Sequence, residues 1–327
     1  MQTKRDFLSG MMGTGLAALT ANASFAQGSA YPSRPIKMIV PYAPGGADVI
    51  ARVISERIYA TLGQPIVIEN KPGAGGAIGT KMVTIADPDG YTLTLASPGP
   101  ITVAPAVVKN LDYDPMKDLV PVGMLATSPF VMVINPDIPA KTVSEFIAYA
   151  KANRGKLNFV TPGFGTTSQL FGEMLKLKAG IDLVHVPYRG SAPAIVDLIS
   201  GQGHLYFDNL RNLQGHIKSG KLRGLAVTTE TRSQDVPELP TMIESGIPDF
   251  VGAYWNGVLA PTGTPASVVE RLNTIINESL RTPEMKTTLA SLGMEAKPMS
   301  PQDFGAFMGT ELKRWIEVAK AGNVKAE

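Results

Sequence analysis

Short runs of β-branched and apolar residues alternate along this chain with segments in which apolar residues recur at the helical period. The runs are typical of strands and lie at residues 36–40, 65–69, 91–95, 130–134, 157–161, 183–186 and 222–227. Strands that alternate with helices are joined by crossovers, which favour parallel sheets. We therefore predict an α/β fold whose sheets are mainly parallel and are flanked by helices.

Three junctions that contain glycine each follow a strand-like run and open a helix-like one. They read PGGAD at 44–48, GAGG at 73–76 and PGFGTTS at 162–168. The first N–H groups of a helix have no intrahelical partner, and the helix dipole adds positive potential there. Gly45 and Gly46 carry no Cβ that would keep a ligand from the backbone. The three junctions together predict one anion-binding cleft.

Polar side chains at these junctions have two interpretations each. Asp48 is predicted to cap the first helix rather than to contact a ligand. The three hydroxyl residues Thr166, Thr167 and Ser168 either cap the helix that follows or hold a ligand oxygen.

Two later segments also carry candidate residues. Arg189 is either a solvated cation or the planar partner of a ligand carboxylate, and Ser191 is predicted to cap the next helix. Asp208 with Asn209 forms a turn, shapes the cleft or binds a ligand amine. Tyr254 and Trp255 either wall the pocket or pack in the core.

Several classes of site are disfavoured. The glycine run at 73–79 places its third glycine one residue late for a dinucleotide loop, and Leu222 replaces the Ser or Thr of a P-loop after residues 215–221. The three histidines lack metal-ligand spacing, cysteine is absent, and no G-x-S-x-G elbow occurs. We therefore expect no cofactor, no metal and no enzymatic activity.

Charge and the first residues bear on partners and location. The chain has 30 basic and 28 acidic residues with no clustered patch, which argues against a nucleic-acid partner. Residues 1–26 combine Lys4 and Arg5, an apolar stretch and a small-x-small site, which predicts a cleaved signal peptide of the Sec or Tat type and a periplasmic location. An uncleaved anchor is the alternative, but the stretch is short for the ~20 residues of a membrane span.

Proline-rich punctuation at 128–129 and 247–248 predicts where the chain divides. We expect residues 27–127 together with 251–327 to form a first, discontinuous domain and residues 128–250 to form a second. A continuous division near residue 128 is the alternative.

Several blocks, in this order, resemble one family. They are VPYAPGGADVIAR, ENKPGAGGAIG, HVPYRGSAPAIVDLISGQ, FDNL, HIKSGKLRGLAVT and WNGVLAPTGTP. The chain resembles the extracytoplasmic solute receptors of tripartite tricarboxylate transporters, the Bug family. This resemblance implies two α/β domains around a cleft, a periplasmic binding protein fold of the Venus flytrap type. It also implies a monomer that binds a small carboxylate and delivers it to membrane transporter subunits.

The resemblance and the junctions together give the candidate ligand-binding residues. They are Gly45, Gly46, Ala47, Asp48, Ala74, Gly75, Ser97, Thr161, Gly163, Gly165, Thr166, Thr167, Ser168, Tyr188, Arg189, Gly190, Asp208 and Trp255. The pair Arg211-Asn212, as well as Asn256, departs from the family pattern, which implies a pocket with its own ligand preference. A receptor that signals to a sensor kinase is the alternative function, followed by a periplasmic hydrolase.

Overall fold

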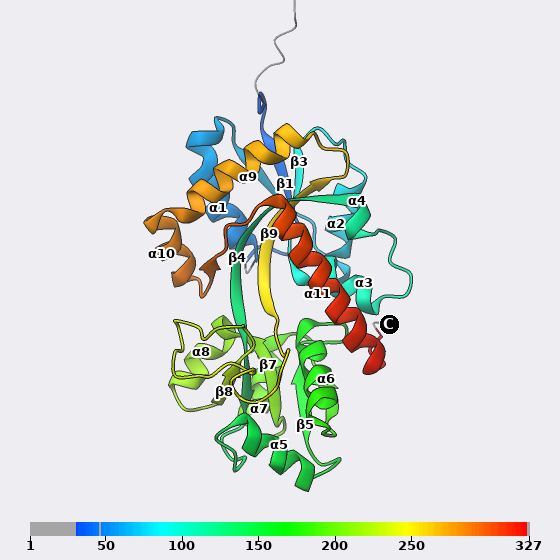
Figure 1. Ribbon diagram of the computed structural model, residues 1–327, viewed down its shortest axis with the longest axis vertical. Helices are drawn as coiled ribbons and strands as arrows, with labels where there is room; N and C mark the ends of the chain where they lie inside the picture. The colour runs from blue at the N-terminus through cyan, green and yellow to red at the C-terminus, as the bar shows by residue number, and fades with distance from the viewer. Residues whose placement is uncertain (1–30, 46, 326–327) are drawn as a thin grey trace, which may run out of the picture. The chain divides into compact units, whose positions relative to one another are not determined.

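Ten strands form one continuous mixed sheet in the computed structural model of Figure 1, which describes residues 31–45 and 47–325. The strands are β1 (Ile36–Val40), β2 (Ile66–Asn70), β3 (Thr92–Ala96), β4 (Leu119–Ile134), β5 (Asn158–Thr161), β6 (Val184–Pro187), β7 (Leu205–Asn209), β8 (Arg223–Val227), β9 (Ala253–Pro261) and β10 (Glu295–Ala296). Their order is β2-β1-β3-β9-β4-β7-β5-β6, and β8 and β10 also pair with β4. The predicted signal peptide and Gly46 lie outside the described residues.

The sheet has two sections that share β4. The first sheet section contains β1, β2, β3, β9, β10 and residues 119–129 of β4, and the second contains residues 130–134 of β4 with β5 to β8. In each section the strands that alternate with helices pair in parallel, namely β1 with β2 and β3, and β5 with β6 and β7. The strand that leaves the first section, β4, pairs antiparallel with β9, along which the chain returns.

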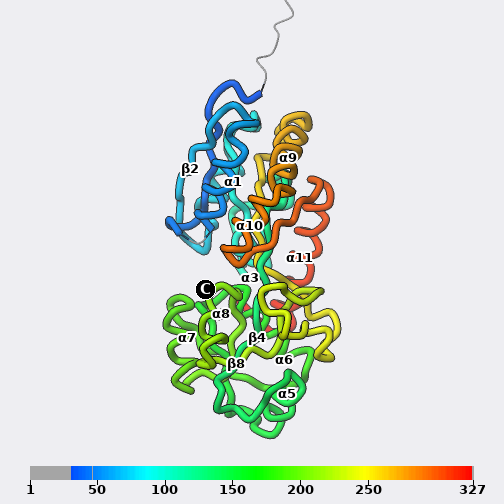
Figure 2. Tube along the Cα trace, turned by 90° about the vertical axis from the view of Figure 1, so that its left-hand side faces the viewer, coloured from blue at the N-terminus to red at the C-terminus, as the bar shows by residue number. Residues whose placement is uncertain are grey.

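Helices flank both sections. They are α1 (Ala47–Leu62), α2 (Ala77–Thr84), α3 (Ala104–Val107), α4 (Pro115–Asp118), α5 (Val143–Ala152), α6 (Thr167–Ala179), α7 (Ser191–Ile199), α8 (Leu210–Lys218), α9 (Ala266–Arg281), α10 (Pro283–Ser291) and α11 (Pro301–Ala321), with short helical turns η1 (Ala74–Gly76) and η2 (Gly99–Val103). Figure 2 shows α5, α6, α7 and α8 gathered around the second sheet section. Apolar faces explain this arrangement: Ile50, Ile54 and Ile58 of α1, for example, are all buried.

The predicted α/β class with helices flanking the sheet is confirmed. The sheet is mixed and not mainly parallel, because β4 and β9 pair antiparallel with each other and with other strands. The contacts between Cα atoms group Pro32–Glu327 into one compact unit. The division into two domains at residues 127 and 250 therefore stays a prediction.

Helix α11 packs against both sheet sections. Its Phe304 and Met308 belong to a core cluster with residues of β1 and β9, whereas Trp315 and Val318 belong to the cluster around α6 and β7. The indole of Trp315 meets the ring of Phe171 edge-on, with centroids 5.2 Å apart. The helix therefore joins the two cores through aromatic and aliphatic contacts.

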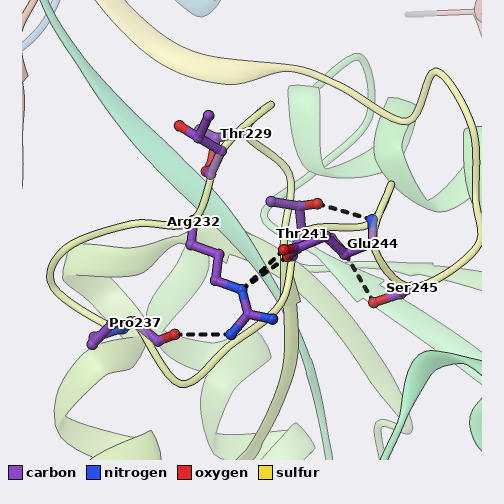
Figure 3. A network of polar contacts seen from close by, with 7 residues as sticks. Thr229, Arg232, Pro237, Thr241, Glu244 and Ser245 are labelled. Carbon is purple, nitrogen blue, oxygen red and sulfur yellow. Dashed lines mark hydrogen bonds and ion pairs between the residues drawn. The ribbon is translucent and has the colours of Figure 1, made fainter.

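The connection between β8 and β9 is held by the polar network of Figure 3. Arg232 donates from Nε to both carboxylate oxygens of Glu244, at 3.1 and 3.0 Å, and from Nη1 to the carbonyl of Pro237. Thr241 and Glu244 exchange reciprocal hydrogen bonds between backbone N–H groups and side chains. The hydrogen bond from the Thr241 N–H and then the Arg232 guanidinium lower the pKa of Glu244. This network folds the loop back on itself, and backbone hydrogen bonds of Val227 in β8 with Pro240 and Met242 attach the loop to the sheet.

Glu311 lies on the turn of α11 between the two core clusters. From its burial we predict that the free energy of unfolding depends on pH. Its side chain is 2% exposed, and burial raises its pKa to about 7, against the opposing effect of Arg314. A raised carboxyl pKa in the folded state contributes stability at low pH that is lost as pH rises from the unfolded-state pKa through the folded one.

The free energy of unfolding of the wild type is therefore expected to fall by on the order of 2 kcal/mol between about pH 5.5 and about pH 7.5 because of Glu311. In Glu311→Gln this decrease should be absent, because the side chain does not titrate. Urea unfolding of both proteins across this range measures the difference. Glu317→Gln, at an exposed position of the same helix, is the control. Parallel pH profiles for wild type and Glu311→Gln would contradict the prediction.

Candidate ligand-binding site

A cavity of about 690 Å³ lies where the carboxyl ends of the parallel strands meet, the usual ligand position in open α/β sheets. The segments after β1, β2 and β3 line it on one side, and those after β5, β6 and β7 line it on the other. Its lining residues are Tyr42, Ala47, Ile50, Gly75, Pro98, Gly99, Phe130, Pro162, Gly165, Thr166, Thr167, Ser168, Ser191, Asp208, Asn209, Arg211, Asn212, Tyr254, Asn256, Leu292 and Met294. The two sheet sections thus face each other across one cavity.

A second cavity, of about 520 Å³, lies at the opposite ends of the first-section strands. Arg34, Lys37, Tyr91 and Thr92 line it, at the amino ends of β1 and β3. It contains none of the predicted ligand-binding residues. We therefore take the 690 Å³ cavity as the candidate site.

Tyr42 provides a hydroxyl on the first-section side of the cavity. It forms a 2.6 Å hydrogen bond with Ser97, whose side chain is buried behind it and does not line the cavity. Burial raises the pKa of Tyr42, so the phenol stays protonated. A Cβ at Gly99 would stand 2.9 Å from this hydroxyl oxygen, which explains the glycine at that position.

Asp48 stabilises the loop instead of capping the helix. Helix α1 begins at Ala47, so Asp48 lies inside its first turn, and the predicted N-cap role is wrong. The residue is 3% exposed, and its carboxylate accepts from Arg52 Nε at 2.8 Å and from Asn70 Nδ2 at 2.9 Å. The hydrogen bond from Arg52 is the largest effect that lowers the Asp48 pKa. Asn70 also donates to the carbonyl of Tyr42, so the ends of β1, β2 and α1 are tied together.

At the junction before α6, the glycine N–H groups serve the loop itself. Gly165 N–H donates to Gln169 Oε1 at 2.7 Å, and Gly163 N–H donates to Thr161 Oγ1 at 3.3 Å. Thr166 caps α6 by accepting from Gln169 N–H. Because first-turn N–H groups have no intrahelical acceptor, those of Thr167 and Ser168 are the donors that this junction leaves for a ligand.

Asp208 is a buried acid in the cavity wall. It is 5% exposed and accepts from Asn209 N–H at 2.8 Å and from Asn212 Nδ2 at 3.0 Å. Burial raises its pKa, and these hydrogen bonds partly oppose the increase. Nearby, the Tyr206 hydroxyl donates to Ser191 Oγ at 3.0 Å. Ser191 is the first residue of α7 and makes no capping bond, so its predicted cap role is also wrong.

The structure distinguishes the two arginines of this region. Arg211, whose N–H donates to Asn209 Oδ1 at 3.0 Å, lines the cavity, and it is the only cationic side chain to do so among the described residues. Arg189 is exposed and does not line the cavity. The Tyr188 hydroxyl donates to Asp197 at 2.6 Å, and burial and then this bond raise the Tyr188 pKa to about 12.

The adjacent residues Tyr254 and Trp255 have different surroundings. Tyr254 lines the cavity, whereas Trp255 is fully buried and meets Phe304 and Phe307 edge-on. Asn256, a departure from the family pattern, also lines the cavity and donates to the carbonyl of Ala96 at 3.3 Å.

The cavity brings together part of the predicted set. Ala47, Gly75, Gly165, Thr166, Thr167, Ser168 and Asp208 line it. Predicted residues that do not line it are Gly45, Asp48, Ala74, Ser97, Thr161, Gly163, Tyr188, Arg189, Gly190 and Trp255. Sequence reasoning missed the lining residues Tyr42, Phe130, Leu292 and Met294. Tyr42 could have been found, because it stands two residues after a predicted strand.

The described residues contain no group of three or more His, Cys, Asp or Glu side chains placed to hold a metal ion. No helix in the described ranges has the length and apolar character needed to cross a bilayer.

Comparison with known proteins identifies the family. The profile of the tripartite tricarboxylate transporter family receptor matches residues 50–324. Protein BugT of Bordetella pertussis is 38% identical over 297 residues, which cover 90% of this chain and 91% of BugT.

Two solved structures extend this comparison. Rpa4515 of R. palustris, solved with adipate, is 34% identical with a TM-score of 0.78, over 90% of this chain and 99% of that one. MatC of Rhodopseudomonas palustris, solved with bound malate, is 34% identical with a TM-score of 0.73, over 88% of this chain and 99% of that one. The chain therefore belongs to the tripartite tricarboxylate transporter family receptors, which are substrate-binding proteins and not enzymes.

Proposed function

We propose that this protein is a periplasmic receptor that binds a small carboxylate in the 690 Å³ cavity and delivers it to the membrane subunits of a tripartite tricarboxylate transporter. The observation that carries the proposal is the pairing of helix N–H donors at Thr167 and Ser168 with the cation Arg211 around one cavity. Helix N-termini and guanidinium groups both favour carboxylate oxygens. Rpa4515 was solved with adipate and MatC with bound malate, which agrees with this ligand class.

The ligand-binding residues that we propose are those in which prediction and cavity coincide, together with Tyr42 and Arg211. The first group comprises Ala47, Gly75, Gly165, Thr166, Thr167, Ser168 and Asp208. Two of the other predicted residues, Asp48 and Ser97, support this wall from behind through their hydrogen bonds to Asn70 and Tyr42. Asp208 lines the same cavity as Arg211, and its carboxyl group favours a ligand that also carries a hydrogen-bond donor.

Calorimetric titration of purified residues 27–327, first unfolded and refolded to remove carried-over ligand, tests the binding. We expect saturable binding and a rise in melting temperature with at least one acid among malate, adipate, glutamate and benzoate, because a ligand that binds only the folded state stabilises it. Adipamide, which has the length of adipate and no charge, is the matched control. An absence of binding by every acid, or equal binding of adipate and adipamide, would refute the carboxylate claim.

Delivery to a transporter needs a separate experiment. We expect uptake of the bound acid by cells that produce this protein with the two membrane subunits of a tripartite transporter, and none when the receptor is omitted. Binding without receptor-dependent uptake would instead favour the sensor kinase alternative. We also propose that residues 1–26 direct export and are removed, which the mass of the protein recovered from the periplasm tests.

A further inference from the structure

His185 lies directly behind the loop that precedes α6. It is in β6, opposite Phe159 of β5, and its imidazole stacks on the Phe159 ring with centroids 4.9 Å apart. Phe164, within the loop, meets the same imidazole edge-on at 5.2 Å. Neither His185 nor Phe164 lines the cavity, so the imidazole makes its contacts with the loop and not with a ligand.

The hydrogen bonds around His185 have one consistent proton arrangement. A backbone N–H can only donate, so Gly165 N–H requires that Gln169 present its Oε1, at 2.7 Å. The Gln169 amide nitrogen then points at His185 Nδ1, at 3.3 Å, and must be the donor. The ring nitrogen Nδ1 therefore accepts, and the single ring proton of the neutral imidazole is on Nε2.

From Nε2 the chain of hydrogen bonds returns to the loop. His185 Nε2 donates to Thr161 Oγ1 at 2.7 Å, and the Thr161 hydroxyl in turn donates to the carbonyl of Gly163 at 3.1 Å. That carbonyl also accepts from Thr166 Oγ1 at 2.9 Å, and Thr166 caps α6. The imidazole thus links both ends of the loop, from Gly163 to Gly165, through two different side chains.

We propose that His185 is a positioning residue that, as the neutral Nε2–H tautomer, orders the loop from Gly163 to Thr166 so that the first N–H groups of α6 face the ligand cavity. This chain of hydrogen bonds, the relay, fixes a segment whose two glycines, Gly163 and Gly165, would otherwise allow several backbone conformations. The effect on affinity, though not the relay itself, rests on the proposed carboxylate-binding function.

The surroundings favour the neutral imidazole. Burial and then the positive charge of Lys176 lower the pKa of His185 to about 4. Lys176 and its partner Glu173, both on α6, are the charged groups that face this region, because β5, the loop at 162–166 and β6 itself carry no other titratable side chain. A second ring proton would be on Nδ1, which would then be a donor that faces the donor N–H group of Gln169. The relay therefore requires the neutral imidazole.

The test combines two substitutions with a matched control. His185→Phe keeps an aromatic ring against Phe159 but has no hydrogen-bonding nitrogen, and Gln169→Met removes the amide at similar length. The control is His204→Phe, the same chemical change at a histidine that accepts from Asn158 N–H at the other end of β5. We expect amide hydrogen exchange at Gly165, measured by NMR on ligand-free protein, to be at least about tenfold faster in His185→Phe and unchanged in His204→Phe.

Affinity is measured for adipate as the probe. His185→Phe and Gln169→Met are each expected to bind it about tenfold more weakly than wild type, and the double variant no more weakly than either single one, because the two residues act as one unit. Additive losses, or Gly165 exchange that is unchanged in His185→Phe, would overturn the proposal. If the wild type binds no acid, the proposed function fails, and the exchange experiment still decides the relay.

The NMR spectrum of the wild-type imidazole provides an independent test, because it reports which ring nitrogen carries the proton. A residue that only packed against Phe159 would not require one particular tautomer. Nitrogen-15 shifts should show an unprotonated Nδ1 and a protonated Nε2 at neutral pH, and this pattern should persist to below about pH 5, well under the usual ~6.5 of histidine. A ring protonated on Nδ1 at neutral pH would contradict the relay.

Discussion

An Arg211→Glu variant is expected to bind its carboxylate ligand about a hundredfold more weakly than the wild type. The substitution removes the only cationic side chain that lines the cavity among the described residues and places a second acid near Asp208. A carboxylate ligand then loses a charge-assisted donor and meets a like charge. Because Arg211 is exposed to solvent, the loss should shrink at high ionic strength. Calorimetric titration at low and high salt measures both effects.

Arg189→Glu is the matched control for this experiment. It makes the same charge change in the same sheet section at an exposed arginine that does not line the cavity. We expect its affinity to stay within about twofold of the wild type. Equal losses in both variants would indicate a long-range charge effect, and wild-type affinity in Arg211→Glu would remove Arg211 from the site.

A Trp315→Ala variant is expected to lose about 3 to 5 kcal/mol of unfolding free energy. Trp315 is fully buried at the end of α11 and packs edge-on against Phe171 of α6, itself stacked on Phe207 and Phe250. Truncation leaves a cavity beside the ring of Phe171 and weakens the attachment of α11 to the second sheet section. Urea unfolding, followed by the fluorescence of the remaining Trp255, measures the change.

The neighbouring residue supplies the control. Ile316 is 44% exposed, so Ile316→Ala should cost less than about 1 kcal/mol. If Trp315→Ala is no more destabilising than Ile316→Ala, the end of α11 does not contribute to the core as the structure indicates.

Local patterns predicted the elements that lie between clear breaks. The bounds of β1 coincide with the predicted run at 36–40, because Pro35 and Pro41 enclose five strand-forming residues. The prediction failed where proline lies within a strand. The predicted strand at 130–134 is only the last part of β4, which also runs through Pro121 and Pro129 and shifts its register with β9 after Pro121 and after Met124. Such bulges depend on the partner strand, which a single segment does not reveal.

For the site, the sequence predicted which residues lie near the cavity better than it predicted what each side chain does there. Strand ends place Gly75, Gly165 and Ser168 at one cavity, because the carboxyl ends of parallel strands meet. The role of Asp48 depended on Arg52 and on Asn70 of another strand, and that of Gly165 on Gln169 one helical turn later. Arg211 and Asn256 were notable in the sequence only as departures from a family pattern, since their place in the wall depends on how α8 and β9 pack.

The pairing of β4 with β9 also has a consequence for the order of folding. Strand β9 pairs along β4 from Leu119–Pro261 to Pro129–Ala253, so the whole second sheet section lies between them in sequence. Contacts of such long range form slowly, since a large loop must close first. Until residues 253–261 arrive, β4 presents an unpaired, largely apolar edge, the kind of edge at which chains aggregate. A nascent chain that stops before β9 thus lacks the strand that pairs with both β3 and β4 in the first sheet section, so the residues from 253 onward determine when that section becomes stable.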